Sequence, residues 1–105
     1  VVAVTGAVDV VTDGEKAVRI EGGSALMPQV TALGCSLTCL VGAFAATAPE
    51  DTFGATVAAL ATFAIAGEEA ALGAAGPGSF SWRFLDALAA LDPETLDARA
   101  RISAA

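Results

Sequence analysis

The chain has 105 residues, a formal net charge of −7 and 55% hydrophobic residues. This length suits one small domain or a fragment of a larger one, and the apolar content excludes an intrinsically disordered chain. The acidic balance argues against nucleic-acid binding, which needs a basic surface. Because histidine is absent, neither a histidine-assisted nucleophile nor a histidine-ligated metal site can form within the chain. No apolar run reaches the roughly 20 residues of a membrane span, so we expect no membrane partner.

The first third of the chain predicts β-structure. Residues 1–4 are a continuous apolar run, which is typical of a strand buried on both faces of a sheet. Apolar and polar residues alternate over 8–10 and again over 18–20, with Asp13-Gly14 between them. This pattern predicts a hairpin with one solvated face. The free edge and faces of the buried strand need cover, which we expect from an absent N-terminal half or another subunit.

The rest of the chain predicts about four helices. After a loop that ends at Gly34, apolar residues recur at helical spacing until Pro49 stops the first helix. Asp51 can cap a second helix, Ser79 a third, and Asp92, which precedes a proline, a fourth. The predicted fold class is therefore α/β, with a buried strand plus hairpin followed by about four helices.

The start of the first predicted helix carries the candidate chemistry. First-turn amides lack intrahelical acceptors and favour anions, and a glycine such as Gly34 lets an anionic group approach the backbone. The same partial charge stabilises a thiolate, so Cys35 is suited to proton transfer or nucleophilic chemistry. From the pattern alone, Cys35 can equally be a small buried thiol. We expect Cys39 to be a packing residue, and both thiols to be reduced, which suits the cytoplasm.

Three segments, taken together, resemble the C-terminal part of the hydroxyethylthiazole kinases, a ribokinase-like family of thiamine salvage. They lie at residues 4–14, at 22–35, which ends in VTALGC, and at 66–88, which contains GPGSF. The resemblance spans nearly all of the chain and about the last two-fifths of a typical family member. It implies that residues 1–105 are a single domain or fragment, the C-terminal portion of a ribokinase-like fold.

The resemblance also implies an activity for the intact protein, namely transfer of the γ-phosphoryl group of ATP, with Mg²⁺, to the hydroxyl of hydroxyethylthiazole. Cys35 would lie beside that hydroxyl as the catalytic residue, and Gly34, Ala32 and Leu33 would bind substrate and phosphate. The family's Gly-Thr-Gly-Cys motif reads Ala-Leu-Gly-Cys here. An alanine Cβ costs about 1 kcal/mol wherever the backbone needs a positive φ, so Ala32 puts the rate in question.

Thr5 and Gly6 end the first predicted strand, and open α/β sheets bind ligands beyond such strand ends. The resemblance implies that these two residues lie near the nucleotide phosphates. It places the Mg²⁺ ligands in the N-terminal half of the family protein, which is not part of this chain, so no metal ligand is assigned here. For the same reason we expect this piece alone to be inactive. Asp9, Glu68 and Glu69 are expected to be solvated charges.

The family forms trimers with active sites near subunit interfaces, so the resemblance implies a homo-oligomer. We expect a cytoplasmic location. Two alternatives remain open from the sequence. One is a non-catalytic, self-associating α/β module. The other is a different ribokinase-like kinase of small alcohols, which would usually carry aspartate where Cys35 stands.

Overall fold

The strands and helices follow the predicted order, with one additional strand at the end of the chain. The computed structural model describes residues 1–105. Its elements are β1 (Val2–Val4), β2 (Val8–Thr12), β3 (Ala17–Glu21), a short 3-10 helix (Met27–Gln29), α1 (Leu33–Thr47), α2 (Thr52–Ala71), α3 (Pro77–Ala90), α4 (Pro93–Arg99) and β4 (Arg101–Ala104). The prediction of an α/β fold with a strand, a hairpin and about four helices is confirmed. No helix has the length and apolar character that crossing a membrane requires.

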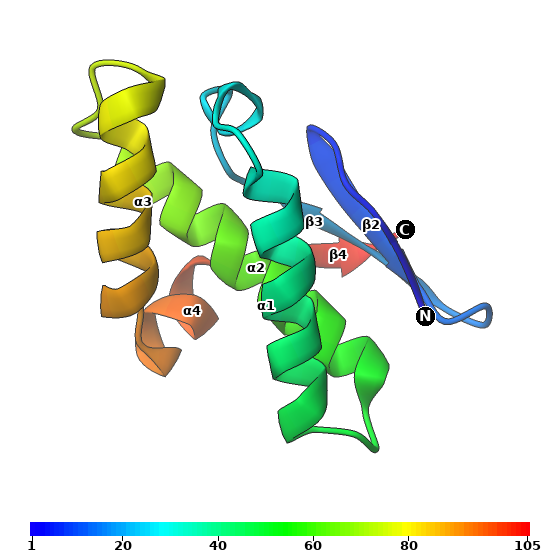
Figure 1. Cartoon of the computed structure of the whole chain (residues 1–105). Helices are drawn as coiled ribbons and strands as arrows, with labels where there is room; N and C mark the ends of the chain where they lie inside the picture. The colour runs from blue at the N-terminus through cyan, green and yellow to red at the C-terminus, as the bar shows by residue number, and fades with distance from the viewer.

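Helix α2 is the centre of the molecule. It contacts β2 and β3 on one side and α1, α3 and α4 on the others, and most of its residues from Ala55 to Ala70 are buried (Figure 1). Phe63 of α2 packs edge-on against Phe84 of α3, with ring centroids 4.7 Å apart, and Phe80 stacks on Phe84. Burial of these large rings supplies much of the hydrophobic stabilisation that holds α3 on α2.

The four strands form one antiparallel sheet in the order β1-β2-β3-β4. The predicted hairpin is confirmed, but the alternation of its first strand is opposite to the expected one. Asp9 lies opposite Ile20 and Val11 lies opposite Val18, and cross-strand partners share a face of the sheet. Since Ile20 and Val11 are buried, Asp9 lies on the inward face, and the prediction of a solvated Asp9 is wrong.

The prediction that the first strand, β1, is buried is wrong. All three of its residues are exposed, with Val2 at 59% and Val4 at 63% exposure. The strand pairs on one side only, antiparallel with β2, and it lies at the edge of the sheet. Val2 lies opposite Thr12 and Val4 opposite Val10, so both valines are on the face of the sheet opposite to the one that carries buried Val11. No other element of the chain reaches the second edge of the strand.

Strand β4 and a cluster of ion pairs were not expected. Glu68 accepts hydrogen bonds from Arg99 at 3.2 Å and from Arg101 at 2.9 Å, and Glu69 accepts one from Arg99 at 2.9 Å. These contacts join the end of α2 to α4 and β4, so the prediction of a solvated charge is wrong for the partly buried Glu68, whereas Glu69 is exposed as predicted and also paired. The arginines lie about 30 residues further along the chain, beyond the reach of a local pattern.

Two of the three predicted helix caps are confirmed. The Asp51 side chain accepts a hydrogen bond from the Gly54 amide at 2.9 Å, and Asp92 accepts one from the Thr95 amide at 2.8 Å. Ser79 is not a cap, because α3 already begins at Pro77 and the cap residue is Gly76. Proline occupies the first helical turn readily because it has no amide hydrogen to satisfy.

Replacing Asp51 by alanine removes the acceptor that caps α2. We expect Asp51→Ala to lower the free energy of unfolding by about 1 kcal/mol, because the Gly54 amide loses its partner. Urea unfolding of the full gene product measures the loss. Glu50→Ala, an exposed neighbour outside the helix, is the control and should change stability by less than about 0.5 kcal/mol. Equal losses in both variants would contradict the capping role.

Candidate functional site

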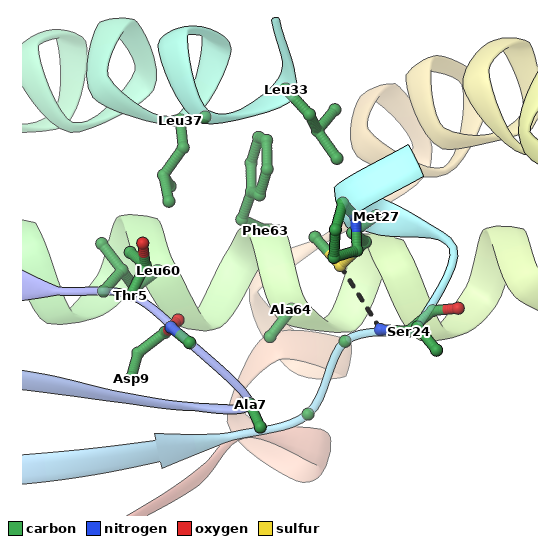
Figure 2. Close-up of a pocket in the computed structure, with 16 residues that line it drawn as sticks. Thr5, Ala7, Asp9, Ser24, Met27, Leu33, Leu37, Leu60, Phe63 and Ala64 are labelled. Atoms are coloured by element: carbon green, nitrogen blue, oxygen red, sulfur yellow. Dashed lines mark hydrogen bonds between the residues drawn. The ribbon is translucent and has the colours of Figure 1, made fainter. Parts of the chain in front are cut away.

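A cavity of about 630 Å³ opens between the sheet and the start of α1 (Figure 2). Its sixteen lining residues come from the loop after β1 with the start of β2 (5–9), the loop after β3 (22–28), the first turns of α1 (33–37) and the middle of α2 (60–64). The volume falls in the range of small-molecule sites. The structure therefore brings the two motifs that were singled out in the sequence, around residues 5 and 34, to one cavity.

Backbone groups define the end of the cavity formed by α1. The cap residue Ala32 has φ 64° and ψ 15°, which is the left-handed conformation. The steric cost that we expected for an alanine with a positive φ therefore applies at this position. The first hydrogen bond of the helix runs from the Ser36 amide to the Ala32 carbonyl, and no side chain caps α1. The amides of Leu33, Gly34 and Cys35 consequently lack intrahelical acceptors and are available to an anion. A Cβ on Gly34 would meet nothing within 4 Å, so the backbone there is open to a ligand.

The strain at Ala32 predicts an unusual stabilising substitution. Ala32→Gly should raise the free energy of unfolding by up to about 1 kcal/mol, because glycine adopts a positive φ without steric penalty. The matched control is Ala43→Gly in the exposed middle of α1, which should lower stability by about 1 kcal/mol. Urea unfolding of both variants, made in the full gene product, should give changes of opposite sign. A destabilised Ala32→Gly variant would show that the left-handed conformation carries no penalty.

Thr5 and Gly6 form the opposite end of the cavity, at the end of β1. The Gly6 amide donates a hydrogen bond to Oδ1 of Asp9 at 3.0 Å, which closes the turn between β1 and β2. Asp9 is the only ionisable residue among those that line the cavity. Burial raises the pKa of Asp9, and the hydrogen bond from Gly6 acts in the opposite direction.

The loop after β3, which lines the cavity between these two ends, includes two glycines and Met27. A Cβ on Gly67 would lie 2.6 Å from Sδ of Met27, so Met27 packs directly against the backbone of α2 there and would have to move to admit a larger residue. Met27 also accepts a hydrogen bond from the Ser24 amide at 3.3 Å (Figure 2). Gly22 has φ 134°, and a Cβ on it would lie 2.6 Å from Oε1 of Glu68, which places the ion-pair cluster directly behind this loop.

The two cysteines lie just outside the cavity lining. Cys35 is the third residue of α1, in its first turn as predicted, and it is exposed beside Gly34. Cys39 is also exposed, so the prediction that it is a packing residue is wrong. Both thiols are free. The buried-thiol alternative for Cys35 is excluded within this chain, because the thiol is exposed at the open start of α1.

The acidic and thiol side chains of the chain do not gather into a metal-binding group. No group of three or more aspartate, glutamate or cysteine side chains lies together in an arrangement that could hold a metal ion. The one carboxylate in the cavity, that of Asp9, already accepts the Gly6 amide. We assign no metal ligand to this chain, because no such group is present and Asp9 is the only carboxylate that lines the cavity.

Asp9 and Met27 are two of the cavity residues that were not predicted from the sequence. The signal for Asp9 was its place opposite Ile20, which only the register of the hairpin reveals. Met27 lay in one of the segments that carry the family resemblance, but its contact with Gly67 joins residues forty positions apart.

The fold and the cavity define an α/β segment in which a helix N-terminus and a strand-end turn face the same space. The model of the hydroxyethylthiazole kinase family matches residues 1–94. The chain therefore belongs to the hydroxyethylthiazole kinase family, and the resemblance inferred from its motifs is confirmed.

Individual relatives agree with this assignment. The chain is 95% identical to a hydroxyethylthiazole kinase of Rhizobium johnstonii and 92% identical to one of Rhizobium leguminosarum bv. trifolii, each over all 105 of its residues and over 39% of the relative. The solved structure of a hydroxyethylthiazole kinase protein from Pyrococcus horikoshii superposes with a TM-score of 0.91 at 38% identity, covering 98% of this chain and 40% of that one. The chain thus spans about two fifths of the length of the relatives it matches.

Proposed function

We propose that the protein containing this chain transfers the γ-phosphoryl group of ATP to the hydroxyl of hydroxyethylthiazole. The observation that carries the proposal is the single cavity shared by the Thr5-Gly6 turn and the open start of α1. Membership of the hydroxyethylthiazole kinase family supports the substrate and the reaction. Phosphoryl transfer needs mainly positioning and charge stabilisation, and this chain contributes both through backbone amides.

In the proposed reaction the thiazole hydroxyl attacks the γ-phosphorus of ATP. A new oxygen–phosphorus bond forms, the bond from the γ-phosphorus to the bridging oxygen breaks, and ADP leaves. Cys35 is the candidate general base that takes the hydroxyl proton and later releases it to water. The amides of Leu33 and Gly34 hold the transferred phosphoryl oxygens, with Ala32 setting the entry of the chain into α1, while Thr5 and Gly6 face the nucleotide phosphates.

The charge of the triphosphate has to be balanced from outside this chain. None of the five basic residues lines the cavity. The use of Mg²⁺ remains a prediction, and its ligands are expected elsewhere in the protein. For the same reason we expect these 105 residues alone not to turn over.

The proposed assembly is a homotrimer, and the proposed location is the cytoplasm. Exposed large apolar side chains support association with further protein, since monomeric proteins rarely leave such groups uncovered. They include Val2, Val4, Trp82, Leu85 and Ile102. Two reduced thiols are consistent with a cytoplasmic location.

A substrate panel tests the proposal. The full gene product, with ATP and Mg²⁺, is assayed on hydroxyethylthiazole, a pyrimidine alcohol and a sugar, with ADP release as the readout. Phosphorylation of the thiazole in clear preference to the others is the expected result. Preference for another alcohol would overturn the substrate assignment, and a folded but inactive protein would favour a non-catalytic binding module.

A further inference from the structure

Asp9 is an unexpected residue to find facing a phosphate-binding cavity. Its carboxylate lies on the inward face of β2 and is half-buried, so part of its hydration is lost. No cation pairs with it. Lys16 is paired with Asp13, Arg99 and Arg101 with the glutamates of α2, and Arg83 lies over the Trp82 ring. The fifth basic residue, Arg19, lies opposite Val10 and therefore on the other face of the sheet from Asp9. A partly desolvated carboxylate without a counter-ion destabilises the fold unless it satisfies something else.

The one polar group that Asp9 satisfies is the Gly6 amide, 3.0 Å from Oδ1. This hydrogen bond spans the turn from β1 to β2 and fixes the backbone next to Thr5. The residues of α2 that form the cavity wall here, Leu60, Phe63 and Ala64, are apolar and offer Asp9 no alternative donor (Figure 2). The orientation of the Thr5-Gly6 turn towards the cavity therefore depends on this acceptor.

We propose that Asp9 is a positioning residue that shapes the nucleotide end of the cavity by holding the Gly6 amide, and that it acts as a hydrogen-bond acceptor rather than as a charge. The inference rests on the proposed function, because it takes the Thr5-Gly6 turn as the part of the site that faces the nucleotide. Its role is indirect, since Asp9 touches the turn and the turn touches the ligand.

The acceptor role separates two substitutions that remove the same charge. Asp9→Asn keeps a carbonyl oxygen within reach of the Gly6 amide, whereas Asp9→Ala leaves that amide unpaired. The matched control is Asp13→Ala. Asp13 also accepts backbone amides, from Glu15 and Lys16 in the same hairpin, but it does not line the cavity.

The test measures nucleotide binding and kinetics in the full gene product. Calorimetry with a non-hydrolysable ATP analogue gives Kd, and steady-state assays give KM for ATP and for the thiazole. We expect Asp9→Ala to raise Kd and the KM for ATP about tenfold while the KM for the thiazole changes by less than about twofold. Asp9→Asn should restore both nucleotide constants to within about threefold of wild type, and Asp13→Ala should leave them unchanged.

An Asp9→Ala variant with wild-type nucleotide constants would overturn the proposal. An Asp9→Asn variant that binds nucleotide as weakly as Asp9→Ala would also overturn it, because the charge of Asp9 would then be the important property. If Asp9→Ala fails to fold, Asp9→Asn decides alone: binding within about threefold supports the acceptor role and a tenfold weakening overturns it. A wild-type protein that binds the analogue but does not phosphorylate the thiazole would refute the proposed function, and the Kd comparison would still judge Asp9.

Discussion

Cys35→Ala should lower kcat of the full gene product on hydroxyethylthiazole by about 10²- to 10⁴-fold, the range that a positioned general base supplies. The thiol is exposed in the first turn of α1, directly after the Gly34 amide that we assign to phosphate. KM for ATP should change little, because the backbone amides that bind phosphate remain. Steady-state kinetics with both substrates at saturation separate the two constants.

Cys39→Ala is the matched control for this substitution. Cys39 is the same residue type, exposed on the same face of the same helix, one turn further from the cavity. Its replacement should leave kcat within about twofold of wild type, as expected for an exposed residue outside the site. An equal loss in both variants would assign the effect to α1 as a whole, and an unchanged Cys35→Ala enzyme would remove the cysteine from the chemistry.

Phe80→Ala should lower the free energy of unfolding by about 3–5 kcal/mol, the largest change in stability that we expect. Phe80 is fully buried and lies in one cluster with Phe63 and Phe84, where α3 meets α2. Removal of the ring loses buried apolar area and leaves a cavity that the two facing rings cannot fill. Urea unfolding of the full gene product measures the change.

Asp86→Ala, on the exposed face of the same helix, controls for effects on helix formation. Asp86 makes no ion pair or side-chain hydrogen bond, so its replacement should change stability by less than about 0.5 kcal/mol. A Phe80→Ala variant that loses no more than this control would mean that α3 is held by contacts other than the aromatic cluster.

The parts of the fold that follow from local chemistry could be predicted from the sequence. The Asp13-Gly14 turn, the Asp51 and Asp92 caps and the stop before Pro49 depend on a few neighbouring residues, and all are present. Ser79 shows the limit of this reasoning, because a competing start at Pro77 two residues earlier replaced it.

The failures concern features that distant residues decide. The inward position of Asp9 depends on the register with β3, the role of Glu68 depends on arginines 31 and 33 residues later, and the exposure of Val2 and Val4 depends on what covers β1. Family resemblance, rather than periodicity, linked Thr5 and Gly34 to one site before the structure brought them to one cavity. The proximity of Thr5 and Gly34 depends on the tertiary structure and cannot be predicted from a local sequence pattern.

The uncovered edge of β1 has a consequence for handling these 105 residues as a separate polypeptide. A row of free backbone donors and acceptors, flanked by two exposed valines, is a template onto which a strand from another molecule can add. The net charge of −7 opposes such growth by mutual repulsion, and salt screens that repulsion. The isolated segment should therefore remain dispersed in dilute buffer and form cross-β aggregates as ionic strength rises.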